Sequence, residues 1–147
     1  MTVLFSKKCE YALQALLFMA EYRHEGPLSA ERIATHLDIP KEFISKILQS
    51  LTKSNIVISQ RGKAGGFRLA RLPEKISLMD VVENIDGLGV FSDCLIGHPS
   101  CNPEAPCPLH HSWAPLRSQL KHLMEKTHLG NFIPGQTLNQ LPDETTV

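Results

Sequence analysis

Three cysteines and a histidine lie close together in the second half of this chain. Cys94, Cys101 and Cys107 are separated by six and five residues, and His110 follows the last cysteine after two more. Thiolate sulfurs and imidazole nitrogens are ligands of zinc, and thiolates also hold iron-sulfur clusters. The spacing therefore predicts a metal centre with three sulfur ligands and one nitrogen ligand.

The residues between these cysteines favour a loop that is ordered by ligation. Few large apolar side chains lie there, so burial alone would hold the segment weakly. A structural zinc site supplies about 10 to 16 kcal/mol of apparent binding free energy. Four prolines keep the segment out of helix and sheet: Pro99, Pro103, Pro106 and Pro108.

The residues alone leave three states of this loop open. A set of three cysteines and one histidine is acceptable for tetrahedral zinc, although the loop lacks the Cys-x-x-Cys pair common in structural zinc sites. An iron-sulfur cluster also accepts thiolates together with one other ligand. The third state is a metal-free thiol switch or a vestigial site.

A fourth cysteine, Cys9, stands apart from the other three. It falls in the first turn of a predicted helix beside Lys7 and Lys8, where the helix N-terminus and positive charge would lower the pKa of a thiol. This position allows a redox-active thiol or an extra ligand next to Glu10. A small side chain packed in the core is the interpretation that we favour.

Charge is distributed unevenly along the chain, although the formal net charge of the 147 residues is zero. Residues 1–71 carry eleven Lys and Arg against six Asp and Glu, and residues 72–147 carry four against nine. The basic half predicts contact with a polyanion such as double-stranded DNA. An apolar content of 42% is enough for one domain with an appendage.

The chain has no apolar run of the roughly 18 residues that a membrane span needs, and its N-terminus lacks a signal-peptide pattern. We therefore expect a cytoplasmic protein that acts on neither a membrane nor a small organic substrate. In a reducing compartment, cysteines indicate metal or redox chemistry more than structural disulfides.

Apolar spacing predicts three helices in the basic half, over residues 7–23, 30–37 and 41–54. Ser6 and Ser29 can cap the first two, and Pro40 is expected at the first position of the third. The short turn between the second and third helices predicts a helix-turn-helix.

The third helix leaves polar side chains on its outward face, and a predicted hairpin follows it. Its strands cover residues 56–60 and 67–70 and enclose a glycine-rich basic tip, which predicts a wing. The tip is no phosphate-binding loop, because neither Gly-Lys-Ser/Thr nor a helix follows. The base-reading candidates are Glu42, Ser45 and Gln49. The phosphate-contact candidates are Lys41, Lys46, Arg61, Lys63 and Arg68.

Two further helices are predicted in the acidic half, over residues 77–83 and 111–127. Ser77 can cap the shorter one, with Asp80 in its first turn. The longer one carries an apolar seam that a second copy of the chain is expected to cover. The seam consists of Trp113, Leu116, Leu120, Leu123 and Thr127.

The predicted fold is mainly α with a small β-hairpin wing. Residues 1–72 form a winged helix-turn-helix domain, 73–110 a linker helix and cysteine loop, 111–130 a long dimerisation helix, and 131–147 a flexible tail. No sequence motif indicates an oxyanion hole or a substrate loop, so we do not expect a thiol enzyme that uses Cys9 or Cys94.

These segments resemble the Rrf2 family of bacterial regulators, which includes the iron-sulfur cluster regulator, the nitric-oxide-sensitive repressor and the rhizobial iron regulator. The resemblance covers nearly the whole chain, and the wing motif is its most specific part. The matching residues are 4–6, 10–12, 43–48 with Leu51, 61–69 and 76–82, together with the three spaced cysteines. The resemblance implies a homodimeric winged-helix transcription regulator that binds an approximately palindromic operator.

The resemblance also implies a cofactor and moves the iron-sulfur interpretation ahead of zinc. His110 matches the histidine position of the iron-sulfur cluster regulator, which implies a 2Fe-2S cluster, and a 4Fe-4S cluster is the alternative. Glu10 matches a carboxylate of the nitric-oxide-sensitive branch that comes from the other subunit. We take His110 as the first choice for the fourth ligand and Glu10 as the second.

The function implied is a sensor of redox state, nitric oxide or iron status. The alternative is a metal-free regulator of the same fold, gated by a cysteine thiol switch or by a partner protein.

Overall fold

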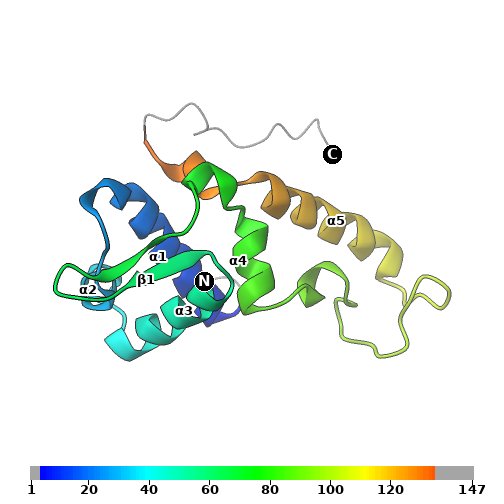
Figure 1. Cartoon of the computed structure of the whole chain (residues 1–147). Coiled ribbons are helices and arrows are strands. Elements are labelled where there is room, and N and C mark those ends of the chain that lie inside the picture. The colour runs from blue at the N-terminus through cyan, green and yellow to red at the C-terminus, as the bar shows by residue number, and fades with distance from the viewer. Residues whose placement is uncertain (1–3, 135–147) are drawn as a thin grey trace.

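The computed structural model describes residues 4–134, which form a mainly helical chain with one antiparallel hairpin (Figure 1). Helices α1 to α4 and the hairpin gather in one body, and α5 extends from that body with the cysteine loop at its far end (Figure 1). The helices are α1 (Lys7–Glu21), α2 (Ala30–Leu37), α3 (Lys41–Lys53), α4 (Leu78–Ile85) and α5 (His110–Lys126), and the strands are β1 (Val57–Gln60) and β2 (Gly66–Leu69).

The predicted fold class is confirmed, and the ends of the elements differ from the predicted ones by one or two residues. Most of the segment predicted as a flexible tail, residues 135–147, lies outside the described residues. Among the helices of residues 4–134, none combines the length and the apolar character that crossing a membrane requires.

Serine side chains cap the N-termini of three helices, α1, α2 and α4. The Oγ atoms of Ser6 and Ser29 accept hydrogen bonds from the main-chain N–H groups of Cys9 and Arg32, both at 3.1 Å. Each such cap contributes about 1 kcal/mol to helix stability. The position predicted for Pro40 was wrong. It precedes the first helical residue of α3 as the N-cap, with an extended ψ of 135°.

The main core is formed by the apolar faces of α1, α2 and α3. The side chains that the spacing of α3 assigns to its inner face, Ile44, Ile47, Leu48 and Leu51, are all buried. They pack with residues of α1 and α2 such as Leu16 and Ile33. Burial of each such side chain is worth about 1.5 to 3 kcal/mol, so this core fixes α3 on the domain.

A second, smaller core connects side chains from four segments of the chain. It consists of Cys9 from α1, Met79 and Val82 from α4, Phe91 from the 3-10 turn Gly89–Phe91, and Met124 from α5. Phe91 precedes Cys94 by three residues. The entrance of the cysteine loop is therefore anchored on α1, α4 and α5.

The hairpin is paired with the segment directly before α2 as well as within itself. Its register aligns Val57 with Leu69 and Gln60 with Gly66. The main chains of Leu28 and Phe67 exchange hydrogen bonds of 2.8 and 2.7 Å, which extend the hairpin by one bridge. A Cβ atom on Gly66, whose φ is +150°, would lie 2.5 Å from the carbonyl oxygen of Leu28. Only glycine fits this approach.

The apolar seam predicted along α5 is right only in part. Leu116 and Leu123 are 56% and 44% exposed. Leu120 instead packs against the second core, and Thr127 is buried. One side of α5 therefore covers its own protomer, and an adjacent side leaves two leucines open to solvent.

Candidate metal centre and nucleic-acid interface

The thiol groups of Cys94, Cys101 and Cys107 converge in the loop between Phe91 and α5. Their sulfur atoms all lie within 4.8 Å of one another. The sulfurs of Cys94 and Cys107 are 3.6 Å apart. All three side chains are half-buried, so the sulfurs are held together in a group that solvent still reaches.

His110 joins this group from the first position of α5. Its Nδ1 atom lies 3.6 Å from the sulfur of Cys101. The main-chain N–H of His110 donates to the carbonyl of Cys107 at 3.0 Å, which closes a turn between the last cysteine and the histidine. The ring of His111 is perpendicular to that of His110. The structure thus brings the three cysteines together and places His110 beside one of them, Cys101, whereas only the cysteine sulfurs all lie within 4.8 Å of one another.

Glu10, the alternative fourth ligand, lies on α1, and its Oε2 atom is 3.1 Å from Nζ of Lys7 in the same protomer. His98 lies in the loop, but its Nδ1 accepts a hydrogen bond from the main-chain N–H of Ser100 at 3.2 Å. Within one protomer, therefore, His110 is the histidine whose ring nitrogen lies beside a cysteine sulfur, that of Cys101.

Short-range hydrogen bonds shape the loop. The main-chain N–H of Cys107 lies 3.4 Å from the sulfur of Cys101 and donates to it. The side-chain oxygen of Asn102 accepts from the N–H groups of Glu104 and Ala105, both at 2.8 Å. This arrangement closes a turn between the second and third cysteines.

The environments of the loop sulfurs differ electrostatically. The main-chain N–H groups of His98 and Ile96 hydrogen-bond the sulfur of Cys94 and lower the pKa of its thiol to about 7. At Cys101, the N–H of Cys107 favours the thiolate, but desolvation and the two neighbouring sulfurs outweigh it and raise the pKa. Neighbouring thiolates repel one another, and a metal that binds all three offsets this repulsion. The donor set therefore fits a zinc ion or an iron-sulfur cluster.

Cys9 is not part of this group of sulfurs. Its side chain is fully buried in the second core. Burial raises the pKa of its thiol to about 12, and the negative charges of Asp86 and Glu10 add to the increase. The lowered pKa expected from the helix N-terminus was wrong because desolvation dominates. The packed side chain is the interpretation that the structure supports.

The candidate DNA-binding residues lie on α3 and the hairpin. Ser45 is half-buried, and the other seven are exposed: Lys41, Glu42, Lys46, Gln49, Arg61, Lys63 and Arg68. Among the ion pairs formed within residues 4–134, none involves the five basic members of this set. Their charges are therefore available to phosphates.

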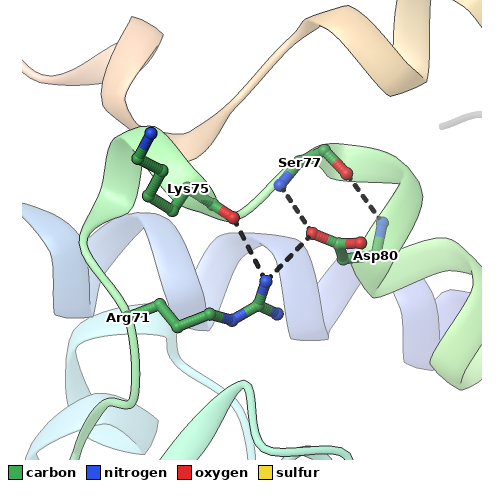
Figure 2. Close-up of polar contacts among 4 residues, drawn as sticks. All are labelled: Arg71, Lys75, Ser77 and Asp80. Atoms are coloured by element: carbon green, nitrogen blue, oxygen red, sulfur yellow. Dashed lines mark hydrogen bonds and ion pairs between the residues drawn. The ribbon is translucent and has the colours of Figure 1, made fainter.

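Arg71, at the end of the hairpin, is held differently (Figure 2). Its Nη1 atom donates to the main-chain carbonyl of Lys75 at 3.2 Å and lies 3.6 Å from Oδ2 of Asp80. Asp80 also accepts from the N–H of Ser77 at 3.0 Å, while its own N–H donates to Ser77 Oγ at 3.1 Å. The sequence predicted the cap but not its link to Arg71.

Two residues of α5 that the sequence did not assign to the site contact the loop. The Nε1 atom of Trp113 and the Nη1 atom of Arg117 both donate to the main-chain carbonyl of Asp93, each at 3.1 Å. These partners are 20 and 24 residues apart in the chain. No local pattern signals such a contact.

Comparison with known proteins gives consistent results. The family model Rrf2, described as an iron-dependent transcriptional regulator, matches residues 5–135. A protein of Aquifex aeolicus whose name describes an HTH-type transcriptional regulator is 34% identical over 133 residues, covering 89% of this chain and 92% of that protein.

Solved structures share the fold. CymR, the global cysteine regulator of B. subtilis, matches with a TM-score of 0.74 at 24% identity, over 85% of this chain and 92% of that one. IscR of T. potens matches with a TM-score of 0.73 at 21% identity, over 99% and 95% of the two chains.

Proposed function

The chain belongs to the Rrf2 family of transcriptional regulators, and we propose that it is a homodimeric DNA-binding regulator whose operator affinity is controlled by an iron-sulfur cluster. The family consists of regulators rather than enzymes. The observation that carries the cofactor part is the convergence of three cysteine sulfurs, with His110 Nδ1 3.6 Å from one of them. The family's description as iron-dependent supports iron over zinc.

Cys94, Cys101, Cys107 and His110 would hold the cluster. A histidine as fourth ligand favours 2Fe-2S, with 4Fe-4S as the alternative, and Glu10 of the partner subunit is the second choice for that ligand. When bound, such a cluster supplies a centre that exchanges electrons and reacts with oxygen or nitric oxide. The signal is then redox state, nitric oxide or iron status.

The loop reaches the DNA-binding elements through packed residues. Phe91, at the entrance of the loop, packs against residues of α1 and α4 in the second core. A movement of the loop would therefore displace side chains that contact these two helices. Asp80 at the start of α4 contacts Arg71 at the base of the wing. A difference of 1 to 3 kcal/mol between two arrangements of these elements changes affinity by about 5- to 150-fold.

On DNA, α3 would enter the major groove and the wing would lie along the backbone or the minor groove. The base-reading candidates are Glu42, Ser45 and Gln49. The phosphate contacts would be the five basic residues of α3 and the hairpin: Lys41, Lys46, Arg61, Lys63 and Arg68. If each protomer neutralises about four phosphates, log affinity should fall against log salt with a slope near −7.

The second subunit would cover α5. Leu116 and Leu123 are the exposed apolar side chains on the side of this helix that its own protomer leaves open. Two protomers joined along α5 would present two copies of α3 to the half-sites of an approximately palindromic operator.

The test is anaerobic purification followed by iron and sulfide analysis, visible absorption, and electrophoretic mobility shift on genomic DNA fragments. We expect a coloured protein with iron and acid-labile sulfide that retards specific fragments. His110→Ala should alter the spectrum more than Glu10→Ala. Protein with neither bound metal nor a shifted fragment would contradict the proposal.

A metal-free thiol switch is the second candidate, favoured by one distance. The sulfurs of Cys94 and Cys107 are 3.6 Å apart, close enough to form a disulfide after a small movement. A colourless anaerobic protein without iron, whose DNA affinity changes with added peroxide and recovers with a thiol reductant, would support this candidate over the cluster.

A further inference from the structure

The main-chain carbonyl of Asp93, directly before Cys94, is held from two sides by α5. The indole N–H of Trp113 and the guanidinium of Arg117 both donate to it at 3.1 Å. A carbonyl oxygen has two lone pairs, so the two donors satisfy it fully. Asp93 is itself exposed, so burial of its side chain does not fix the position of this peptide group.

The same face of α5 carries the histidine of the metal centre. His110, Trp113 and Arg117 are spaced by three and four residues, which places them one above another on a helix. His110 Nδ1 lies 3.6 Å from the sulfur of Cys101. One helix therefore sets the position of the histidine and, through the Asp93 carbonyl, the position of the first cysteine.

We propose that Trp113 and Arg117 are positioning residues of the metal centre, which hold Cys94 at the distance from His110 that ligation requires. The inference rests on the proposed metal centre. The main-chain hydrogen bonds along the loop, such as that from the Gly97 N–H to the Cys94 carbonyl at 3.0 Å, span only a few residues. They shape turns but do not tie Cys94 to α5. The two hydrogen bonds to the Asp93 carbonyl connect this part of the loop to α5. They order the loop before a metal binds and so reduce the entropic cost of ligation.

The test uses Co²⁺ as the probe on the full-length protein, because Co²⁺ binds thiolates and imidazoles and its bonds to sulfur absorb visible light. Trp113→Phe removes the N–H donor and keeps an aromatic ring, and Arg117→Met removes the second donor. Lys121→Met, on the exposed surface of the same helix, is the control with the same change of charge as Arg117→Met.

We expect Co²⁺ affinity, measured against a competing chelator, to fall about 2- to 10-fold for each lost donor and further in the double variant, because one net hydrogen bond has roughly that effect. Lys121→Met should bind as the wild type does. Equal affinities of the wild type and the double variant, within about twofold, would overturn the inference.

Alkylation of the metal-free protein separates positioning from unfolding. In the double variant, the rate of iodoacetamide modification of Cys94 should change relative to that of Cys101, while buried Cys9 stays protected. Exposure of Cys9 in the same variant would assign the loss of affinity to unfolding and overturn the inference. A wild-type protein that binds no Co²⁺ through sulfur would instead contradict the proposed metal centre.

Discussion

The guanidinium of Arg71 lies 3.6 Å from the carboxylate of Asp80, so the base of the wing is joined to the first turn of α4 (Figure 2). Both side chains are partly exposed, at 41% and 37%. An ion pair of this kind contributes about 0 to 1 kcal/mol to stability. The main effect of this ion pair is on the direction of the Arg71 guanidinium, which contacts groups of the protein itself.

Arg71→Gln should leave the salt dependence of DNA binding almost unchanged, because its guanidinium already has partners. Lys46→Gln is the matched control on the exposed face of α3. If Lys46 contacts one phosphate per protomer, its loss should reduce the slope of log affinity against log salt by about 1.8 for a dimer. Equal reductions in the two variants would place Arg71 on the DNA backbone.

The thiols should react in a fixed order in metal-free protein. Main-chain hydrogen bonds lower the pKa of the Cys94 thiol to about 7, and burial raises the pKa of the Cys9 thiol to about 12. The thiolate is the reactive form. Alkylation of Cys94 should accelerate as the pH rises from 6 to 8, and Cys9 should stay unmodified over this range. Mass spectrometry of peptides measures both rates. Unfolding in urea should abolish the difference, and a native Cys9 that reacts as fast as Cys94 would contradict the burial described here.

Gly66→Ala should destabilise the wing and weaken DNA binding. The added Cβ atom would lie 2.5 Å from the carbonyl oxygen of Leu28, and φ is +150°. Gly62→Ala is the control, because φ is +107° there but no atom lies within 4 Å of the added group. We expect a cost of about 1 to 3 kcal/mol from backbone strain in both variants, with an additional cost for Gly66→Ala. Urea unfolding measures the difference, and equal costs would mean that the approach to Leu28 imposes no constraint.

Cys101→Ala should abolish metal binding and leave the dimer intact. Its sulfur lies beside both His110 Nδ1 and the other two sulfurs, whereas the exposed leucines of α5 lie elsewhere on that helix. Iron analysis together with sedimentation velocity checks both parts. A variant that keeps its full iron content would remove Cys101 from the ligand set.

Charges on the open side of α5 should separate the protomers. Leu116→Glu with Leu123→Glu places two carboxylates where two apolar side chains are 56% and 44% exposed. Sedimentation velocity should show a monomer in place of a dimer. Lys121→Glu, a charge reversal at another exposed position of the same helix, should remain dimeric. A dimer that persists in the double variant would mean that another surface joins the subunits.

Much of this fold could be predicted from the sequence because its signals are local. Ser6, Ser29 and Ser77 each cap the helix that follows, and the spacing of Ile44, Ile47 and Leu48 identifies the buried side of α3. The convergence of the cysteines was also predictable, because a proline-rich loop of this length lets three thiols meet.

The remaining features depend on contacts between distant segments. Trp113 and Arg117 reach Asp93 across 20 and 24 residues, and periodicity alone placed Trp113 in an apolar seam. The pKa of Cys9 was misjudged because the sequence shows the helix N-terminus beside it but not the depth of the second core.

Trp113 is the single tryptophan of the chain, and its indole nitrogen is hydrogen-bonded one residue away from Cys94. Tryptophan fluorescence of the unlabelled protein therefore comes from one indole at the entrance of the sulfur-rich loop. Changes in emission wavelength or quenching would follow occupancy of that loop in real time, without a dye.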